Sequence, residues 1–105
     1  MAAEQPEDLM IKDLNSETNR FNLEAKVTEK SASRIVFSKW GGEFLLSTAT
    51  VMDRSGTIRL PLWNDLVGMV SIGDLLHIEN ARLKRFRGEL QVRVDKSSKL
   101  RIIEK

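Results

Sequence analysis

"NDLVGMVSIGD", residues 64–74, is the stretch that decides the fold, because it separates two blocks of strand-like sequence. On both sides of it, apolar and polar residues alternate with a period of two, which is typical of half-buried β-strands. Within it the alternation stops. Asn64 can cap a single helical turn, and Gly73-Asp74 are typical of a turn into the next strand. The sequence therefore predicts a short helical link between two sets of strands.

The alternating stretches predict five principal strands. They fall at residues 20–30, 43–53, 57–65, 75–86 and 89–96, with a short added strand at 99–105. Residues 53–56, "DRSG", have the composition of a turn between antiparallel strands. The side chains expected to face the core are those on the apolar side of each strand: Phe21, Leu23, Ala25, Val27, Leu45, Ala49, Val51, Ile58, Leu60, Leu62, Leu76, Ile78, Leu90, Val92 and Val94.

Five short strands in 105 residues cannot fill the two sheets of a sandwich, whereas closure into a small barrel removes exposed sheet edges. We therefore predict an all-β fold, a five-stranded Greek-key barrel of the oligonucleotide/oligosaccharide-binding (OB) type. Its short helical link would join strands three and four. A five-stranded SH3-like barrel is the alternative, but that fold lacks a long connection at the place of residues 64–74.

The length suits one small domain. Residues 1–8 are short, acidic and contain Pro6, so we expect a mobile N-terminal arm, followed by a single domain over residues 9–105. The first residues of that domain can lie against it as a turn of helix or an extended cap. The sequence contains no bilayer-spanning apolar run and no signal-peptide pattern, and it lacks cysteine. These features favour a reducing, cytoplasmic location.

Composition and motifs do not indicate an enzyme. The single histidine, His77, and the lack of cysteine argue against a zinc site. The motifs of phosphate loops, nucleophile elbows and metalloproteases are missing. We therefore expect no catalysis, no cofactor or metal, and no membrane or small-molecule partner.

The charge is unevenly distributed along the chain. The net charge is +2, but residues 1–81 hold 8 Lys/Arg against 12 Asp/Glu, and residues 82–105 hold 9 against 3. This asymmetry indicates a polyanion met on one side of the molecule. A solvated basic tail is the alternative, and the position of these residues on the fold must decide.

Trp63 lies on the polar side of its predicted strand. It shares that side with Arg59 and faces away from Leu62. It can cover the barrel mouth as a lid or serve as a platform for an unpaired base, a contact worth about 1–3 kcal/mol per base. The neighbouring cations favour the platform.

Phe86 raises a similar question within "NARLKRFRGEL", residues 80–90. It shares its side of the strand with Arg82 and Lys84. Residues 76 and 78 have the same parity, yet they belong to the predicted core. We therefore predict a bulge or sharp bend near Asn80-Ala81 that switches the faces of the strand.

A loop rich in aromatic residues is expected between the first two strands, at residues 33–44. It carries Lys39 and Trp40 next to two glycines, and then Phe44. Binding residues concentrate in loops between rigid strands, and this loop would border the groove of an OB barrel. Packing of Trp40 on the barrel end remains an even alternative, and Phe37 is expected to pack in the core or the loop.

Three stretches carry a resemblance to a known family. "IKDL" (11–14), "VMDRSGTIRLPLWND" (51–65) and "SIGDLLHIENARLKRFRGELQV" (71–92) resemble the simple single-OB-fold single-stranded DNA-binding proteins of archaea. They also resemble the human single-strand sensor subunits related to replication protein A. The resemblance covers residues 9–103, nearly the whole chain.

The resemblance implies base stacking on two residues, Trp63 and Phe86. Some archaeal members carry a further tryptophan directly after "IENA", where this chain has Arg82. A guanidinium plane can also stack on a base, and Trp40 can compensate from the loop. Many archaeal members have a glycine-rich acidic tail for protein partners, which the sequence up to Lys105 does not contain.

We therefore predict binding of single-stranded DNA with little sequence preference, in replication, recombination or repair. The residues expected to stack on bases are Trp63, Phe86, Trp40 and Phe44. Those expected to contact phosphates or bases are Arg82, Lys84, Arg59, Arg87, Arg93 and Lys39. The alternatives, in falling order, are single-stranded RNA, a protein-interaction module that could serve DNA-processing proteins, and a carbohydrate site.

Overall fold

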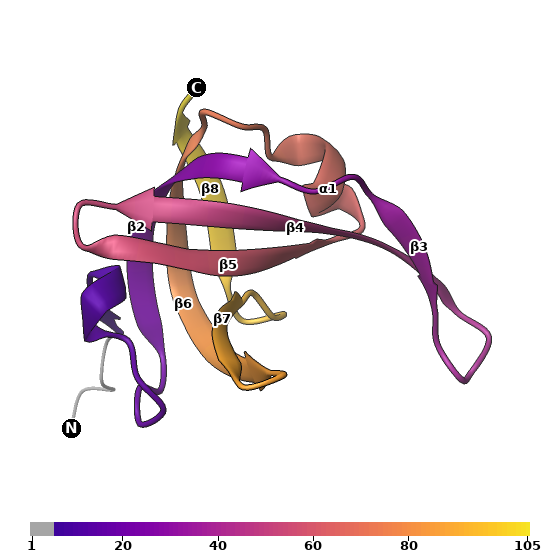
Figure 1. Cartoon of the computed structure of the whole chain (residues 1–105), viewed down its shortest axis with the longest axis horizontal. Helices are drawn as coiled ribbons and strands as arrows, with labels where there is room; N and C mark the ends of the chain where they lie inside the picture. The colour runs from indigo at the N-terminus through magenta and orange to yellow at the C-terminus, as the bar shows by residue number, and fades with distance from the viewer. Residues whose placement is uncertain (1–5) are drawn as a thin grey trace.

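The computed structural model describes residues 6–105 (Figure 1). Its elements, in chain order, are β1 (Glu7–Asp8), the 3₁₀ turn η1 (Ile11–Asp13), β2 (Phe21–Lys30), β3 (Arg34–Phe37), β4 (Glu43–Asp53), β5 (Gly56–Trp63), α1 (Asp65–Met69), β6 (Leu75–Phe86), β7 (Glu89–Arg93) and β8 (Lys99–Glu104).

Five of these strands close into a barrel. The neighbours around it are β2, β4, β5, β7 and β6, and pairing of β6 with β2 completes the ring. The β5–β7 pair is parallel and the other four pairs are antiparallel. α1 connects β5 to β6, the third and fourth barrel strands in chain order. The predicted barrel and its helical link are confirmed.

The core follows the predicted alternation with a few differences. Fully buried side chains come from the apolar side of all five barrel strands, together with Ala81, which the sequence analysis did not assign to the core. Ile58, Leu90 and Val94 are half-buried. Leu45, predicted to face the core, is 37% exposed. It lies where β4 runs past the barrel, so no opposite strand covers it.

The two helical segments lie at opposite ends of β4 and β5 (Figure 1). Val67 of α1 and the following Val70 are buried at one end, and Ile11 of η1 is buried near the β4–β5 turn. The carboxylate of Asp53 accepts a hydrogen bond from the backbone N–H of Ile11 at 2.8 Å. Burial alone would raise the pKa of Asp53, but hydrogen bonds from Ser55 and from backbone N–H groups outweigh it and hold that pKa below its ordinary value.

The helix start differs from the prediction. Asn64 occupies the N-cap position, but its side chain does not cap α1. Its Oδ1 accepts from the N–H of Leu45 at 3.1 Å, and its own N–H donates to the Leu45 carbonyl at 2.8 Å. Asn64 has a φ of 54°, and its side chain contacts β4. It therefore joins the end of β5 to the start of β4.

The N-terminal segment is partly ordered by pairing. Of the arm expected over residues 1–8, residues 1–5 lie outside the described residues, and Glu7–Asp8 pair in parallel with the start of β2. The expected helical turn is present as η1. The boundary between arm and domain stays a prediction. None of the helices within residues 6–105 is long and apolar enough to cross a membrane.

The stretch expected as a loop contains a strand instead. Residues 34–37 form β3, which pairs with Glu43–Leu46 of β4, and the resulting hairpin projects from the barrel (Figure 1). Phe37 was expected to be packed, which is wrong, because its side chain is 68% exposed. It lies opposite Glu43, beyond the reach of the core.

Candidate nucleic-acid interface

A β-bulge at Asn80 sets the orientation of the residues that follow it. Phe21 of β2 pairs with Ala81, whereas Leu23 pairs with Ile78, so β6 has one extra residue between these pairs. Ile78 and Ala81 are both buried although their parities differ. The predicted switch of faces is therefore confirmed. Beyond the bulge, the even-numbered residues of β6 point away from the core.

Several hydrogen bonds hold this bulge. The N–H of Asn80 donates to Asn22 Oδ1 at 2.9 Å, and the Asn80 carbonyl accepts from Arg20 Nη1 at 2.9 Å and from Ser98 Oγ at 2.8 Å. The side-chain amide of Asn80 donates to the carbonyl of Ser97 at 3.1 Å. Asn80 has a φ of 57°, a left-handed conformation that asparagine tolerates better than most residues.

The bulge produces a continuous outer face over β4, β5, β7 and the second half of β6. Residues that pair directly across strands share a face, so the pairing defines its rows. Arg59 lies opposite Gln91, which lies opposite Lys84. Two further rows join β6 to β7: Arg82 lies opposite Arg93, and Phe86 lies opposite Glu89. We call this surface the outer face.

Trp63 and Phe44 lie together at one end of the outer face. Trp63 lies opposite Leu46 of β4, and Phe44 lies two residues before Leu46 on the same strand. The two rings make an edge-to-face contact with centroids 6.3 Å apart. Their side chains remain about two-fifths exposed, at 42% and 40%. Trp63 is therefore oriented by Phe44 but not buried by it.

The other two predicted stacking residues, Trp40 and Phe86, lie at hairpin tips. Trp40 is 86% exposed, so the alternative that it packs on the barrel end is wrong. The ammonium of Lys39 lies 5.4 Å from its ring. Phe86 is 49% exposed at the end of β6, and the guanidinium of Arg87 lies 5.3 Å from its ring. Each tip thus combines an accessible ring with a cation.

Trp63 and Phe86 lie at opposite ends of the outer face. Trp63 is four residues beyond Arg59 on β5, and Phe86 is two residues beyond Lys84 on β6, which runs the opposite way. With a rise of about 3.3 Å per residue, the two rings are on the order of 20 Å apart along the strands. They are too far apart to sandwich one base, so each offers a separate stacking surface.

Two of the predicted phosphate ligands are already near carboxylates. Arg59 Nε lies 3.4 Å from Glu89 Oε1, and Arg82 Nε lies 3.8 Å from Asp95 Oδ2. The remaining predicted cations make no ion pair in the described part of the chain: Lys39, Lys84, Arg87 and Arg93.

Asp95 is a structural carboxylate. It accepts from Arg20 Nη1 at 3.1 Å, from the N–H of Ser97 at 2.9 Å and from Ser98 Oγ at 3.2 Å. The hydrogen bond from Arg20, followed by that from the Ser97 backbone, lowers the pKa of Asp95 to about 2. The carboxylate thus fixes the turn between β7 and β8 beside the bulge.

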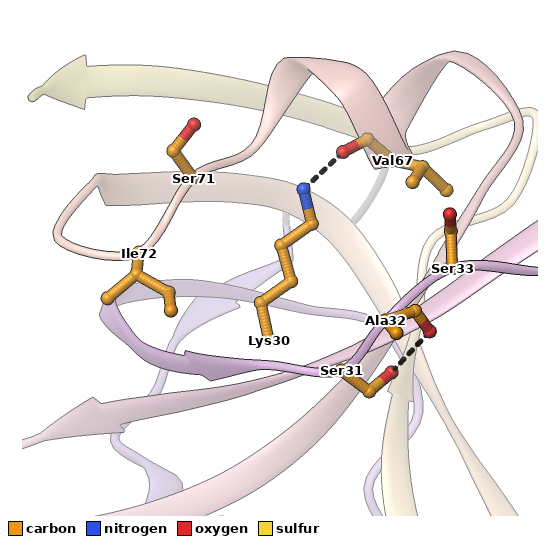
Figure 2. A pocket seen from close by; sticks show the side chains of 7 residues that line it. All are labelled: Lys30, Ser31, Ala32, Ser33, Val67, Ser71 and Ile72. Carbon is orange, nitrogen blue, oxygen red and sulfur yellow. Dashed lines mark hydrogen bonds between the residues drawn. The ribbon is translucent and has the colours of Figure 1, made fainter.

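A separate hollow of about 400 Å³ lies between the end of β2, the segment before β3, and α1 with the turn that follows it (Figure 2). The candidate interface residues do not line it. Lys30 points from β2 toward α1 and donates to the carbonyl oxygens of Val67 and Val70, the latter at 2.8 Å. Its ammonium therefore caps the end of α1. Among residues 6–105, no group of His, Asp or Glu side chains is arranged to hold a metal ion.

Comparison with known proteins identifies the family. The model of the Ssb-like single-stranded DNA-binding proteins with an OB fold matches residues 8–102. The chain belongs to this family. The single-stranded DNA-binding protein Ssb of Saccharolobus solfataricus is 32% identical over 79 residues, which make up 75% of this chain and 53% of that protein. The chain thus spans about half the length of this curated relative.

Solved structures agree with this assignment. The OB domain of a Thermoplasma acidophilum protein matches with a TM-score of 0.79 at 22% identity, covering 92% of this chain and 87% of that one. A domain of replication protein A from Methanococcus maripaludis matches with a TM-score of 0.73 at 27% identity, covering 93% and 97%. The predicted OB fold and the resemblance to archaeal single-stranded DNA-binding and replication protein A domains are confirmed.

Two features of this Ssb-like OB domain were missed by the sequence analysis. The first is Glu89, a carboxylate among the cationic, aromatic and neutral side chains of the outer face. Glu89 comes directly after the two-residue turn Arg87-Gly88, so the sequence could have predicted that it lies opposite Phe86. The second is the set of polar contacts around Asn80, made by residues up to 60 positions away in sequence. Such distant partners cannot be read from local patterns.

Proposed function

We propose that this chain binds single-stranded DNA with little sequence preference through the outer face and protects it during replication, recombination or repair. In this proposal Trp63, Phe86, Trp40 and Phe44 stack on unpaired bases. Phosphates are contacted by Arg59, Arg82, Lys84, Arg87, Arg93 and Lys39. In duplex DNA the base faces are stacked on one another and are not accessible to these rings. The site should therefore prefer single strands.

The observation that carries the proposal is the face switch at Asn80. Without the bulge, Lys84 and Phe86 would be on the core side of β6; with it, they share the outer face with Arg59 and Trp63. On the same face, Arg82 lies directly opposite Arg93, and like charges in that position destabilise a sheet. Asp95 lies 3.8 Å from Arg82 and offsets part of this repulsion, whereas Arg93 makes no ion pair within residues 6–105. A bound polyanion would relieve the rest. The arrangement is thus more easily explained by phosphate binding than by stability.

Tryptophan fluorescence tests the proposal directly, because the chain has two tryptophans, both in the proposed interface. W40F leaves Trp63 as the reporter, and W63F leaves Trp40. Titration with oligo-dT is expected to quench both variants. W63A is expected to lower affinity by about 1–3 kcal/mol, the usual contribution of one stacked base.

The controls are a duplex, a ribonucleotide and a variant. A duplex of the same length should bind much more weakly, and competition with oligo-U measures the preference for DNA over RNA. Met69→Ala changes an exposed apolar residue of α1, outside the proposed interface, and should bind like the unaltered chain. Absence of quenching, or equal affinity for duplex and single strand, would refute the proposal.

A further inference from the structure

The outer face carries one carboxylate within its described strands. On β4, β5, β7 and the part of β6 beyond the bulge, the outward side chains are cationic, aromatic, apolar or neutral except for Glu89. It is exposed and lies directly opposite Phe86. A negative charge in this place repels phosphates, so its presence on a polyanion-binding surface requires an explanation.

Glu89 is held loosely. Its Oε1 lies 3.4 Å from Arg59 Nε and 3.4 Å from Gln91 Nε2, both long contacts for a charged acceptor. Asp95 differs, since Arg20, Ser97 and Ser98 all donate to it. Asp95 is therefore fixed, whereas Glu89 can leave Arg59 at little cost.

A contribution to folding stability does not explain the ion pair between Arg59 and Glu89. The two side chains are 59% and 51% exposed. Exposed pairs of this kind contribute little to folding, because solvent screens them and ordering two long side chains opposes them. Replacing Glu89 should leave the fold as stable as before. Its effect is expected in binding instead.

Resting on the proposed function, we propose that Glu89 sets the affinity of the outer face by competing with the nucleic-acid phosphate for Arg59. In the free protein the carboxylate neutralises Arg59. On binding, a phosphate replaces the Glu89 carboxylate at Arg59. Breaking the ion pair costs free energy, and this cost weakens binding. Glu89 therefore makes binding weaker and less dependent on salt than the number of cations would indicate.

The test compares the unaltered chain with Glu89→Gln by oligo-dT titration at several salt concentrations. E89Q is expected to bind about 1.5- to 5-fold more tightly, the range expected for release of an exposed ion pair. Its plot of log affinity against log salt should be steeper by about 0.7, the contribution of one phosphate contact on a single strand. The urea midpoint should not change.

Glu79→Gln is the matched control. Glu79 pairs with Arg101 at 3.0 Å on β6 and β8, with exposures of 39% and 61%, and the substitution makes the same change in net charge. It should not alter binding. Equal effects of E79Q and E89Q would show a general charge effect and overturn the proposal, as would an E89Q variant with unchanged affinity and salt slope.

A double-mutant cycle with Arg59→Gln separates competition from simple repulsion. If Glu89 acts through Arg59, the gain from E89Q disappears in the R59Q background. A gain that persists there would mean that Glu89 repels the DNA directly and would overturn the exchange. Failure of the unaltered chain to bind oligo-dT at all is a different result: it would refute the proposed function and this inference with it.

Discussion

At Asn80 the backbone has a φ of 57°, a left-handed conformation that costs most L-residues about 1–2 kcal/mol. Asparagine reduces this cost, and here its amide also donates to Ser97 at 3.1 Å. The position of the bulge was predictable from the sequence, because the core residues and the interface residues of β6 have the same parity and yet had to face opposite sides of the strand. The contacts from Arg20, Asn22 and Ser98 that fix it were not, because they depend on how distant segments meet.

Asn80→Ala is expected to lower the free energy of unfolding by about 1–3 kcal/mol, the sum of left-handed strain and a lost hydrogen bond. Asn80→Gly should cost less, because glycine adopts this φ without strain. Urea denaturation gives both values, and Asn19→Ala, at an exposed position, is the control. The account would be wrong if N80A were as stable as the unaltered chain, or if N80G were the less stable of the two.

Among the elements, the β3–β4 hairpin departs most from the sequence analysis. The alternation in β2, β4 and β5 was readable because each strand has one face on the core. β3 lacks that contrast: Ile35, Val36 and Phe37 are consecutive apolar residues, and the hairpin extends past the barrel. The rule that apolar residues lie in the core therefore failed for Phe37, although it held for Phe21.

The hairpin has two faces that can be tested separately. Phe44 lies on the outer face beside Trp63, whereas Phe37 lies opposite Glu43 on the other face. Phe44→Ala is expected to weaken oligo-dT binding by about 1–3 kcal/mol, because it removes a proposed stacking surface together with the edge contact that orients Trp63. Phe37→Ala, on the same hairpin, should leave binding unchanged. Equal losses in the two variants, measured by the same titration, would contradict this division of the faces.

For the whole molecule, the fold resolves the question raised by the basic C-terminal segment. Residues 82–105 do not form a tail in the structure; they complete β6 and add β7 and β8. Part of this charge lies on the outer face, as at Lys84, and part is paired elsewhere, as at Arg101 with Glu79. Composition revealed the asymmetry, but only the register of β6 and β7 assigned each cation to a surface.

Two carboxylates, Asp53 and Asp95, attach peripheral segments to the barrel, and their pKa values predict how stability depends on pH. Asp53 ties η1 to the β4–β5 turn, and Asp95 ties Arg20 to the turn before β8. In the folded protein the pKa of Asp95 is about 2, below the ordinary aspartate value of 3.8, and the pKa of Asp53 is also lowered. An acid with a lowered pKa stabilises the fold above its unfolded-state pKa. That contribution is lost as the pH falls from about 4 toward 2.

The urea midpoint is therefore expected to be constant from about pH 7 to 5 and to fall below about pH 4. Asp95→Asn should lower the midpoint at neutral pH, since it removes the charge that Arg20 contacts, and should flatten the decrease below pH 4 because one titrating group is gone. Glu17→Gln, at an exposed position of the loop before β2, is the control and should follow the unaltered chain. If the urea midpoint of D95N fell with acid as much as that of the unaltered chain, Asp95 would not be the carboxylate responsible. The loss of stability would then have to come from protonation of Asp53, which attaches η1.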